Sequence, residues 1–296
     1  MSQSMKYILR STLLMVGMVF GSTSVIFIKA STEHPYLVAS YRLWIAALVL
    51  TPFFLTELRR SRSSYSWKYL GSSTLPALAL AFHFMSWVVG ARMTPVANAS
   101  LLVNMVPVAL PFILWILYRE MVNRAEIMAT ILALAGVVVL SGVSFQTDRS
   151  MFIGNLVCFG SMLGYAAYLG LGRRNRATIS LWVYLVPLYY LAGLFCFITA
   201  LFTINPIKPY DLENVLYILG LGLLPTVIAH SVLNYSLRYF RGQVVGVATA
   251  AQPISAVIMG FVFFGEAPPP VFYIAAALVG AAIMIALFKG EAYQRK

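Results

Sequence analysis

The chain has 296 residues, of which 60% are hydrophobic and 10% are charged, and its mean hydropathy is +0.84. This composition excludes a soluble domain, which must cover itself with polar side chains, and indicates a polytopic membrane protein. The net charge of +12 does not indicate nucleic-acid binding, because the basic residues occur in short clusters between apolar spans, where membrane-topology signals are found.

Five apolar spans are expected in the first half of the chain. The first follows two basic residues and has no clear small-residue cleavage site, so it is interpreted as a retained helix and not a signal peptide. At about 20 residues per span, the five spans lie near 8–28, 35–56, 69–91, 96–118 and 125–143. A short polar linker at 144–150 then separates the two halves.

The second half repeats this plan, with spans expected near 151–172, 179–203, 214–237, 243–264 and 271–288. One offset of 146 residues relates three pairs: Arg92 and Arg238, Pro107 and Pro253, Glu120 and Glu266. The first span of each half carries a G-x-x-x-G pattern, which lets membrane helices approach closely. We therefore expect two five-helix repeats as domains, at 1–143 and 151–290.

Pro107 and Pro253 lie deep inside the fourth span of their halves. Proline lacks an N–H group, so it frees the carbonyl four residues earlier, which here belongs to Val103 and to Thr249. Freed carbonyls near the bilayer midplane predict a transport path.

The basic residues predict the orientation of the chain. Sixteen of the 21 lysines and arginines fall on one side of the predicted spans, which places both termini in the cytoplasm. Because each half has an odd number of spans, the second half enters the membrane from the opposite side. The repeats are therefore expected to be inverted, an arrangement that recurs in transporters.

The order and spacing of these features resemble the EamA type of the drug/metabolite transporter superfamily. The residues that carry the resemblance are the fourth-helix prolines, the closing glutamates Glu120 and Glu266, the fifth-helix glycines Gly136 and Gly280, and Arg42. The first helix departs from the pattern, with Phe20-Gly21 where many members have Trp-Gly. The resemblance implies a ten-helix, all-α inverted-repeat transporter of the inner membrane, with a central cavity, that exports metabolites such as amino acids.

Polar and aromatic side chains share a face on several spans, where contact with lipid would be costly. On the fourth span that face holds Ser100, Asn104, Pro107 and Pro111, and on the eighth it holds Thr226, His230 and Asn234. The residues expected to contact a substrate are His83, Trp87, Asn104, Pro107, Tyr165, Tyr168, His230, Asn234, Gln252 and Pro253. The competing interpretation is structural, because amides and hydroxyls also join helices and aromatic residues form interfacial belts.

Arg42 lies about seven residues inside its span, near enough to the outer face for its side chain to snorkel. The alternative is that Arg42 attracts a substrate carboxylate. All nine acidic residues fall in loops or at helix ends, so none shares its depth.

The absence of a carboxylate within the spans favours neutral or amphipathic cargo such as amino acids, aromatic ones among them. A proton-coupled multidrug exporter is the alternative, and His83 or His230 could carry a proton.

A membrane-embedded enzyme is the rival from another class. It would need a nucleophile, paired carboxylates or a metal-ligand cluster, and the three histidines are far apart in sequence. We expect no enzymatic activity, no cofactor and no metal, and we expect Cys158 and Cys196 to fill space within spans. The expected partners are the lipid bilayer and a small-molecule substrate, and the protein is expected to function as a monomer.

Overall fold

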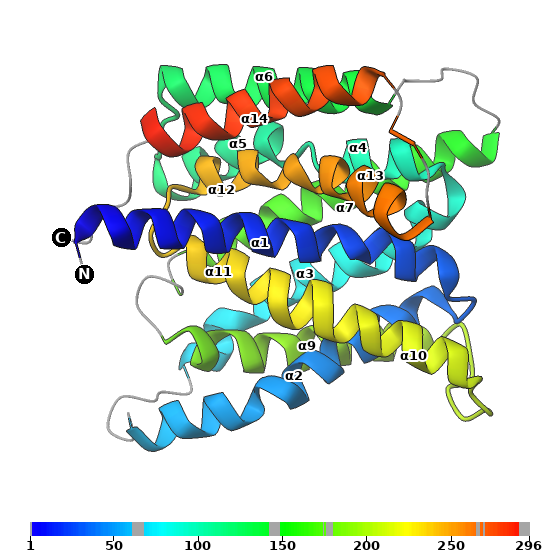
Figure 1. Cartoon of the computed structure of the whole chain (residues 1–296). Helices are drawn as coiled ribbons and strands as arrows, with labels where there is room; N and C mark the ends of the chain where they lie inside the picture. Colours follow the sequence, from blue (N-terminus) through cyan, green and yellow to red (C-terminus); the bar gives the residue numbers. More distant parts are fainter. Residues whose placement is uncertain are drawn as a thin grey trace.

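A computed structural model describes residues 2–60, 68–141, 149–173, 175, 180–264, 267–268 and 270–289. Within these residues every regular element is a helix, which confirms the expected all-α membrane class. The helices lie side by side in one bundle (Figure 1). Glu266 and most of the predicted linker lie outside the described residues.

The first half contains α1 (Gln3–Ala30), α2 (Pro35–Arg60), α3 (Lys68–Met93), α4 (Val96–Val103), α5 (Val106–Tyr118) and α6 (Arg124–Ser141). The second half contains α7 (Arg149–Leu171), α9 (Leu181–Leu201), α10 (Leu212–Leu221), the π-helix η1 (Gly222–His230), α11 (Ser231–Ser236), α12 (Gly242–Thr249), α13 (Ala251–Phe264) and α14 (Val271–Lys289). Two predicted spans are broken, into α4 with α5 and into α12 with α13. One predicted span continues without a break through α10, η1 and α11.

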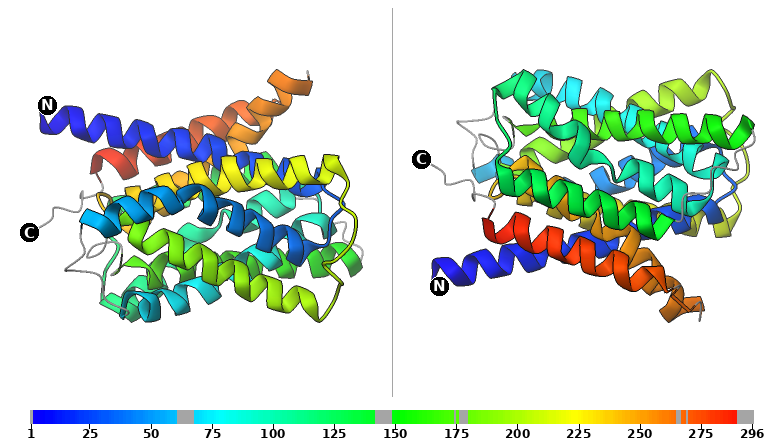
Figure 2. Two further views of the ribbon diagram at one scale, coloured as in Figure 1. Left: turned by 90° about the horizontal axis from the view of Figure 1, so that it is seen from below. Right: turned by 90° about the horizontal axis from the view of Figure 1, so that it is seen from above.

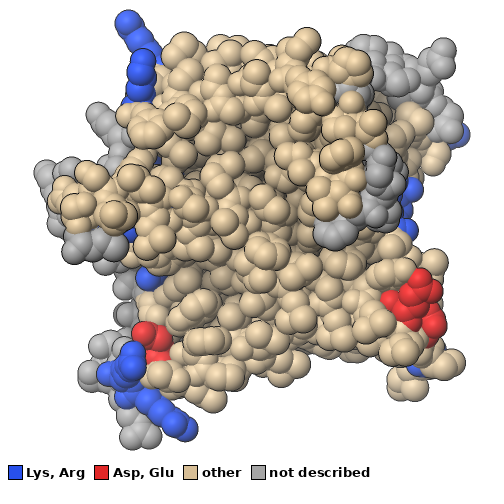
Figure 3. Space-filling view, viewed as in Figure 1, with Lys and Arg blue, Asp and Glu red and all other residues tan. Residues whose placement is uncertain are grey.

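The surface of the bundle suits a lipid environment. In the described residues, nine helical segments are long and apolar enough to cross a membrane, and α6 packs along α14 as a further 18-residue helix. Figure 3 shows Lys, Arg, Asp and Glu side chains at the two margins of the face in view, with a broad band between them that bears no charged side chain. An apolar band between polar margins is what a bilayer requires of a spanning bundle.

The two halves run in opposite directions. Helix α1 begins at the left edge of Figure 1, whereas α7, the first helix of the second half, begins at the right edge. The contacts between helices follow the same two-fold relation: α3 packs on α7 as η1 packs on α1, and α2 packs on α9 and α6 on α14 (Figure 2). If each helix is replaced by the helix at the same place in the other half, the same contacting pairs of helices result. The inverted repeat that the sequence predicts is therefore present in the packing.

Glycines of α1 and α7 allow the close contacts that bring these helices to the centre. A Cβ atom on Gly17 would lie 2.7 Å from Val232 Cγ1 of α11, and a Cβ atom on Gly164 would lie 2.7 Å from Phe82 Cδ1 of α3. A Cβ on Gly21 would lie 3.2 Å from the Gln252 side chain of α13. These glycines belong to the two predicted G-x-x-x-G patterns, so the expected close approach is confirmed.

Charged side chains form salt bridges and hydrogen bonds at both ends of the bundle. At the end where α1 finishes, Lys208 Nζ lies 2.6 Å from Glu33 Oε1, and Arg92 donates to the carbonyl oxygens of Ile28, Ser31 and Glu33. At the opposite end, Glu120 pairs with Arg173, and Arg241 Nε lies 2.7 Å from Glu126 Oε1. Each cluster joins segments that are distant in sequence.

Candidate functional site

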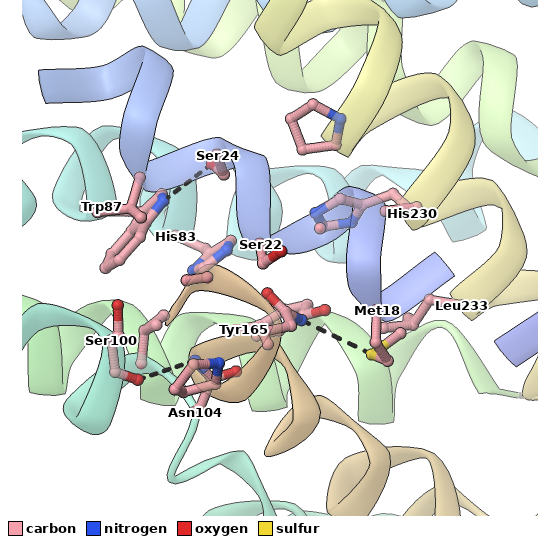
Figure 4. A pocket seen from close by; sticks show the side chains of 18 of the residues that line it. Met18, Ser22, Ser24, His83, Trp87, Ser100, Asn104, Tyr165, His230 and Leu233 are labelled. Atoms are coloured by element: carbon pink, nitrogen blue, oxygen red, sulfur yellow. Dashed lines mark hydrogen bonds between the residues drawn. The ribbon is translucent and has the colours of Figure 1, made fainter. Parts of the chain in front are cut away.

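Residues of both halves line a cavity within the bundle, and Figure 4 shows it from close by. A sphere the size of a water molecule can be centred in about 50 Å³ of it. Since a water needs roughly 10–15 Å³ by that measure, this space can hold several waters. The wall consists of Met18, Gly21, Ser22, Ser24, Val25, Arg42, His83, Phe84, Trp87, Ser100, Val103, Asn104, Tyr165, Pro225, Ala229, His230, Leu233, Gln252, Pro253 and Ala256.

The two broken spans contribute to this wall. Helix α4 ends at Val103 and α12 ends at Thr249, which are the two residues whose carbonyls the prolines were expected to free. Pro107 falls in the first turn of α5, where a missing N–H group costs no intrahelical hydrogen bond. At the first break Asn104 donates its side-chain amide to the carbonyl oxygen of Ser100 at 2.8 Å, and both residues lie in the wall.

The π-helix η1 forms around Pro225, which the sequence analysis had not linked to a change of helix type. Pro225 has no N–H group for the carbonyl of Leu221, four residues earlier. The hydroxyl of Thr226 donates to that carbonyl oxygen at 2.7 Å. Gly222 lets α2 approach this turn, because a Cβ atom there would lie 2.6 Å from Ile45 Cγ2. π-Helical turns often occur at functional sites.

The position of Arg42 of α2 contradicts one of the two alternatives expected for it and leaves the other open. The side chain does not snorkel to the outer face, because 1% of its surface is exposed and it lies in the cavity wall. Its Nε donates to Thr226 Oγ1 at 3.0 Å and its Nη1 donates to Ser24 Oγ at 3.4 Å. Its guanidinium carbon lies 4.0 Å from the centre of the Phe84 ring.

The two histidines of the wall are held by aromatic rings (Figure 4). The ring of His83 stacks on Tyr165 with 4.5 Å between ring centres, and its Nδ1 lies 2.9 Å from Ser161 Oγ and 3.0 Å from Ser161 O. His230 meets Phe84 edge-on at 5.1 Å. Within the described part of the chain the Nδ1 of His230 is buried without a hydrogen-bond partner. This nitrogen could therefore form a hydrogen bond with a ligand in the cavity.

Seven of the ten residues expected to contact a substrate lie in the wall of the cavity. They are His83, Trp87, Asn104, Tyr165, His230, Gln252 and Pro253. Contact with a substrate remains a prediction for each of them.

The other three, Pro107, Tyr168 and Asn234, lie behind the wall. The amide of Asn234 donates to Tyr168 Oη and to the carbonyl of His230, both at 2.6 Å, and neither side chain is exposed. Pro107 packs toward Gly246 of α12, and its carbonyl accepts from Gln243 Nε2 at 2.9 Å. Contact of these three residues with a substrate stays a prediction. For Pro107 and Asn234 it had extended one helical face through the break after Asn104 and through η1, where the helical periodicity changes, whereas Tyr168 lies on the unbroken α7.

Several wall residues were not on the list of expected contacts, and Ser24 and Arg42 matter most among them. The hydroxyl of Ser24 accepts hydrogen bonds from Arg42 Nη1 and from Trp87 Nε1, the latter at 3.2 Å. The signal in the sequence was Arg42 itself, a charge within a span that has no acidic residue at its depth. Among the residues of the wall, Arg42 is the only one with a permanent charge.

The described residues contain no group of three or more His, Cys, Asp or Glu side chains that could hold a metal ion. Cys158 and Cys196 are free and buried within helices. The sulfur of Cys158 fills the space beside Gly90, where a Cβ atom would lie 2.6 Å from it.

Known proteins resemble this chain in sequence and in fold. The EamA-like transporter family matches residues 10–142 and, a second time, residues 152–288. An uncharacterised transporter of Archaeoglobus fulgidus is 25% identical over 93% of this chain and 95% of its own length. A WAT1-related protein of Arabidopsis thaliana is 32% identical over 45% of this chain and 38% of its own length. One crystal structure superposes with a TM-score of 0.77 at 18% identity, over 95% of this chain and 97% of that one, and shares its fold.

Proposed function

The chain belongs to the EamA-like transporter family, and on that premise we propose that it exports small amphipathic metabolites, such as amino acids and aromatic ones among them, by alternating access. It is a multi-pass membrane transporter. The observation that carries the finer proposal is the central cavity, whose wall combines aromatic rings, amides and one cation. Such a lining suits a small molecule with both a polar and an apolar part.

Alternating access is supported by the central cavity, by the charged clusters at both ends of the bundle and by the broken spans beside the cavity. Cargo must enter the central cavity from one side of the membrane and leave it on the other, so the helices around the cavity must move. Salt bridges join the segments at the two ends of the bundle, on either side of this space. The breaks after Val103 and Thr249 supply places where a span can bend on either side of the site. Opening one charged cluster while the other stays closed gives access from one side at a time.

The orientation proposed is that of an inner-membrane protein with both termini in the cytoplasm. The start of α1 and the end of α14 lie at the same end of the bundle (Figure 1), and the charge distribution assigns that end to the cytoplasm. The cluster of Glu33 and Lys208 then faces outward, and the cluster of Glu120 and Arg241 faces inward. Residues 1–143 and 151–290 would act as the two moving repeats of a functional monomer.

Export of cationic drugs is the less favoured candidate. A cation entering this cavity would meet the guanidinium of Arg42 and, among the wall residues, no carboxylate. Like charges in a site of low dielectric constant repel each other strongly.

The test is transport by the purified protein in liposomes, measured as exchange of a labelled aromatic amino acid against the same compound inside. Gly21→Leu and Gly280→Leu form a matched pair, because a side chain on Gly21 points at Gln252 in the wall, whereas one on Gly280 meets open space. We expect Gly21→Leu to lower transport at least tenfold, on the order of 1.4 kcal/mol, and Gly280→Leu to transport like the wild type. Equal transport by both variants would contradict a path through this cavity.

A further inference from the structure

The guanidinium of Arg42 is the group in the cavity wall whose role the proposed function explains least. We propose that the preferred cargo is an organic monoanion, a carboxylate with an apolar body and no ammonium group, whose carboxylate binds the free end of Arg42. The inference rests on the proposed transport function and narrows the range of cargo to one charge class.

The hydrogen bonds of Arg42 leave the end of its guanidinium open. A guanidinium has five N–H donors, one on Nε and two on each terminal nitrogen. Thr226 accepts from Nε and Ser24 accepts from Nη1, and both acceptors are uncharged hydroxyls. The remaining donors lie on Nη1 and Nη2, the two nitrogens that form a fork matching the two oxygens of a carboxylate.

The described part of the chain supplies no anion to this fork. Its carboxylates stand at the ends of the bundle, where Glu33 pairs with Lys208 and Glu126 pairs with Arg241. None of them lies within salt-bridge distance of Arg42. A buried cation without a counter-charge is costly, and in membrane spans such residues mark substrate or ion paths. Cargo that brings a negative charge removes this cost.

The guanidinium is fixed in the orientation that such binding needs. Phe84 covers one of its faces at 4.0 Å, and Thr226 and Ser24 hold its edge from two other helices. A donor pair that is already ordered loses little entropy when a carboxylate binds. The neighbouring wall residues Trp87 and Tyr165 provide aromatic surface for an apolar body (Figure 4).

An ammonium group finds no matching charge in the same wall. Its acceptors are neutral, among them the side-chain amides of Asn104 and Gln252. The ring of Tyr165 is stacked on His83, so that face cannot receive a cation. A zwitterion would therefore gain the contact of its carboxylate with Arg42 but lose the hydration of its ammonium group. A simple carboxylate gains the same contact and has no ammonium group to dehydrate.

The experiment compares compounds that share one body and differ in charge, using thermal unfolding of the purified full-length protein to measure binding. One set is phenylacetate, phenylacetamide, phenylalanine and phenethylamine, and the other is isovalerate, isovaleramide, leucine and isoamylamine. In the wild type the carboxylate of each set should raise the melting temperature most, followed by the amino acid. An amine or an amino acid that stabilises the protein more than its carboxylate would overturn the inference.

Three variants test whether Arg42 is the group that binds the carboxylate. Arg42→Gln should weaken carboxylate binding by about tenfold or more, as expected for loss of hydrogen bonds between charged groups, and leave binding of the amide unchanged. Arg42→Lys keeps the charge and the fold but lacks the planar fork, so it should bind the carboxylate less tightly than the wild type. Arg149→Gln removes one charge from the exposed start of α7 and should have no effect. Equal losses for carboxylate and amide in Arg42→Gln would show a purely structural role and overturn the proposal.

The same compounds, tested for transport in liposomes, separate this inference from the proposed function. Transport of amino acids with no preference for the carboxylates would contradict the inference and leave the function intact. Binding of carboxylates through Arg42 without transport of any compound would support the inference and contradict the function.

Discussion

The Nε of Arg42 donates a hydrogen bond to Oγ1 of Thr226 at 3.0 Å, which joins the second helix of one half to the π-helix of the other. The same hydroxyl donates to the carbonyl of Leu221, which Pro225 leaves without its usual partner. One side chain thus bonds to the backbone of η1 and holds Arg42, which among the described residues of the cavity wall is the one with a permanent charge. The pair links the local effect of a proline to the geometry of the site.

Replacing Thr226 should therefore affect both stability and binding. Thr226→Val keeps the shape but leaves the Nε of Arg42 without its partner and removes the hydroxyl bond to the carbonyl of Leu221, which should cost about 1–3 kcal/mol of unfolding free energy. Thr226→Ser retains the hydroxyl and should stay close to the wild type. The measurement is thermal or denaturant unfolding in detergent, together with transport. If valine and serine behave alike, the hydroxyl does not support Arg42.

His230 and Asn234 should separate into a transport residue and a structural one. His230→Ala removes a wall residue and should lower transport about tenfold, on the order of 1.4 kcal/mol, with normal amounts of folded protein. Asn234→Ala removes a fully buried amide that bonds to Tyr168 and should lower the amount of folded protein instead. Transport per molecule and abundance in the membrane are measured for each variant. Reduced abundance of His230→Ala with normal transport per molecule would contradict this assignment.

Pro107 and Pro253 should bias the transporter in opposite directions. An alanine at either position restores an N–H group that can bond to the carbonyl at the preceding break, so the two short helices can join into one. Since the repeats are inverted, Pro107→Ala and Pro253→Ala act at mirrored places on the path. Single cysteines introduced along the cavity, in a variant without Cys158 and Cys196, are labelled from each side. Identical labelling in the wild type and both variants would show that the prolines shape the cavity without gating it.

The salt bridge between Lys208 and Glu33 should hold the outward end of the bundle closed. Lys208→Met removes the pair and should shift the population toward the outward-open state by up to about fivefold, since a partly exposed pair contributes about 1 kcal/mol or less. Lys208→Arg preserves the charge and serves as the control. Labelling of a cysteine at Ser24 from the outside reports the shift, and a rate unchanged by Lys208→Met would exclude a latch at this position.

Local chemistry in the sequence accounts for the spans and for their breaks. The lengths of the apolar runs place the helices, because backbone groups in lipid must be paired within a helix. The ends of α4 at Val103 and of α12 at Thr249 follow from the missing N–H groups of Pro107 and Pro253. The odd number of spans in each half gives the inverted arrangement. These features depend on residues that are neighbours along the chain, so the sequence alone determined them.

The tertiary structure alone decided which side chains face the cavity. The position of Arg42 along its span gives its depth but not its lateral neighbours, and its partners Ser24, Phe84 and Thr226 come from α1, α3 and η1. Tyr168 and Asn234 followed the expected helical spacing, yet they bond to each other behind the wall. A helical face predicted from spacing holds only while the helix keeps one period and one axis. The break in the fourth span and the π-helix change both, and only the packing of the helices against each other shows where each face then points.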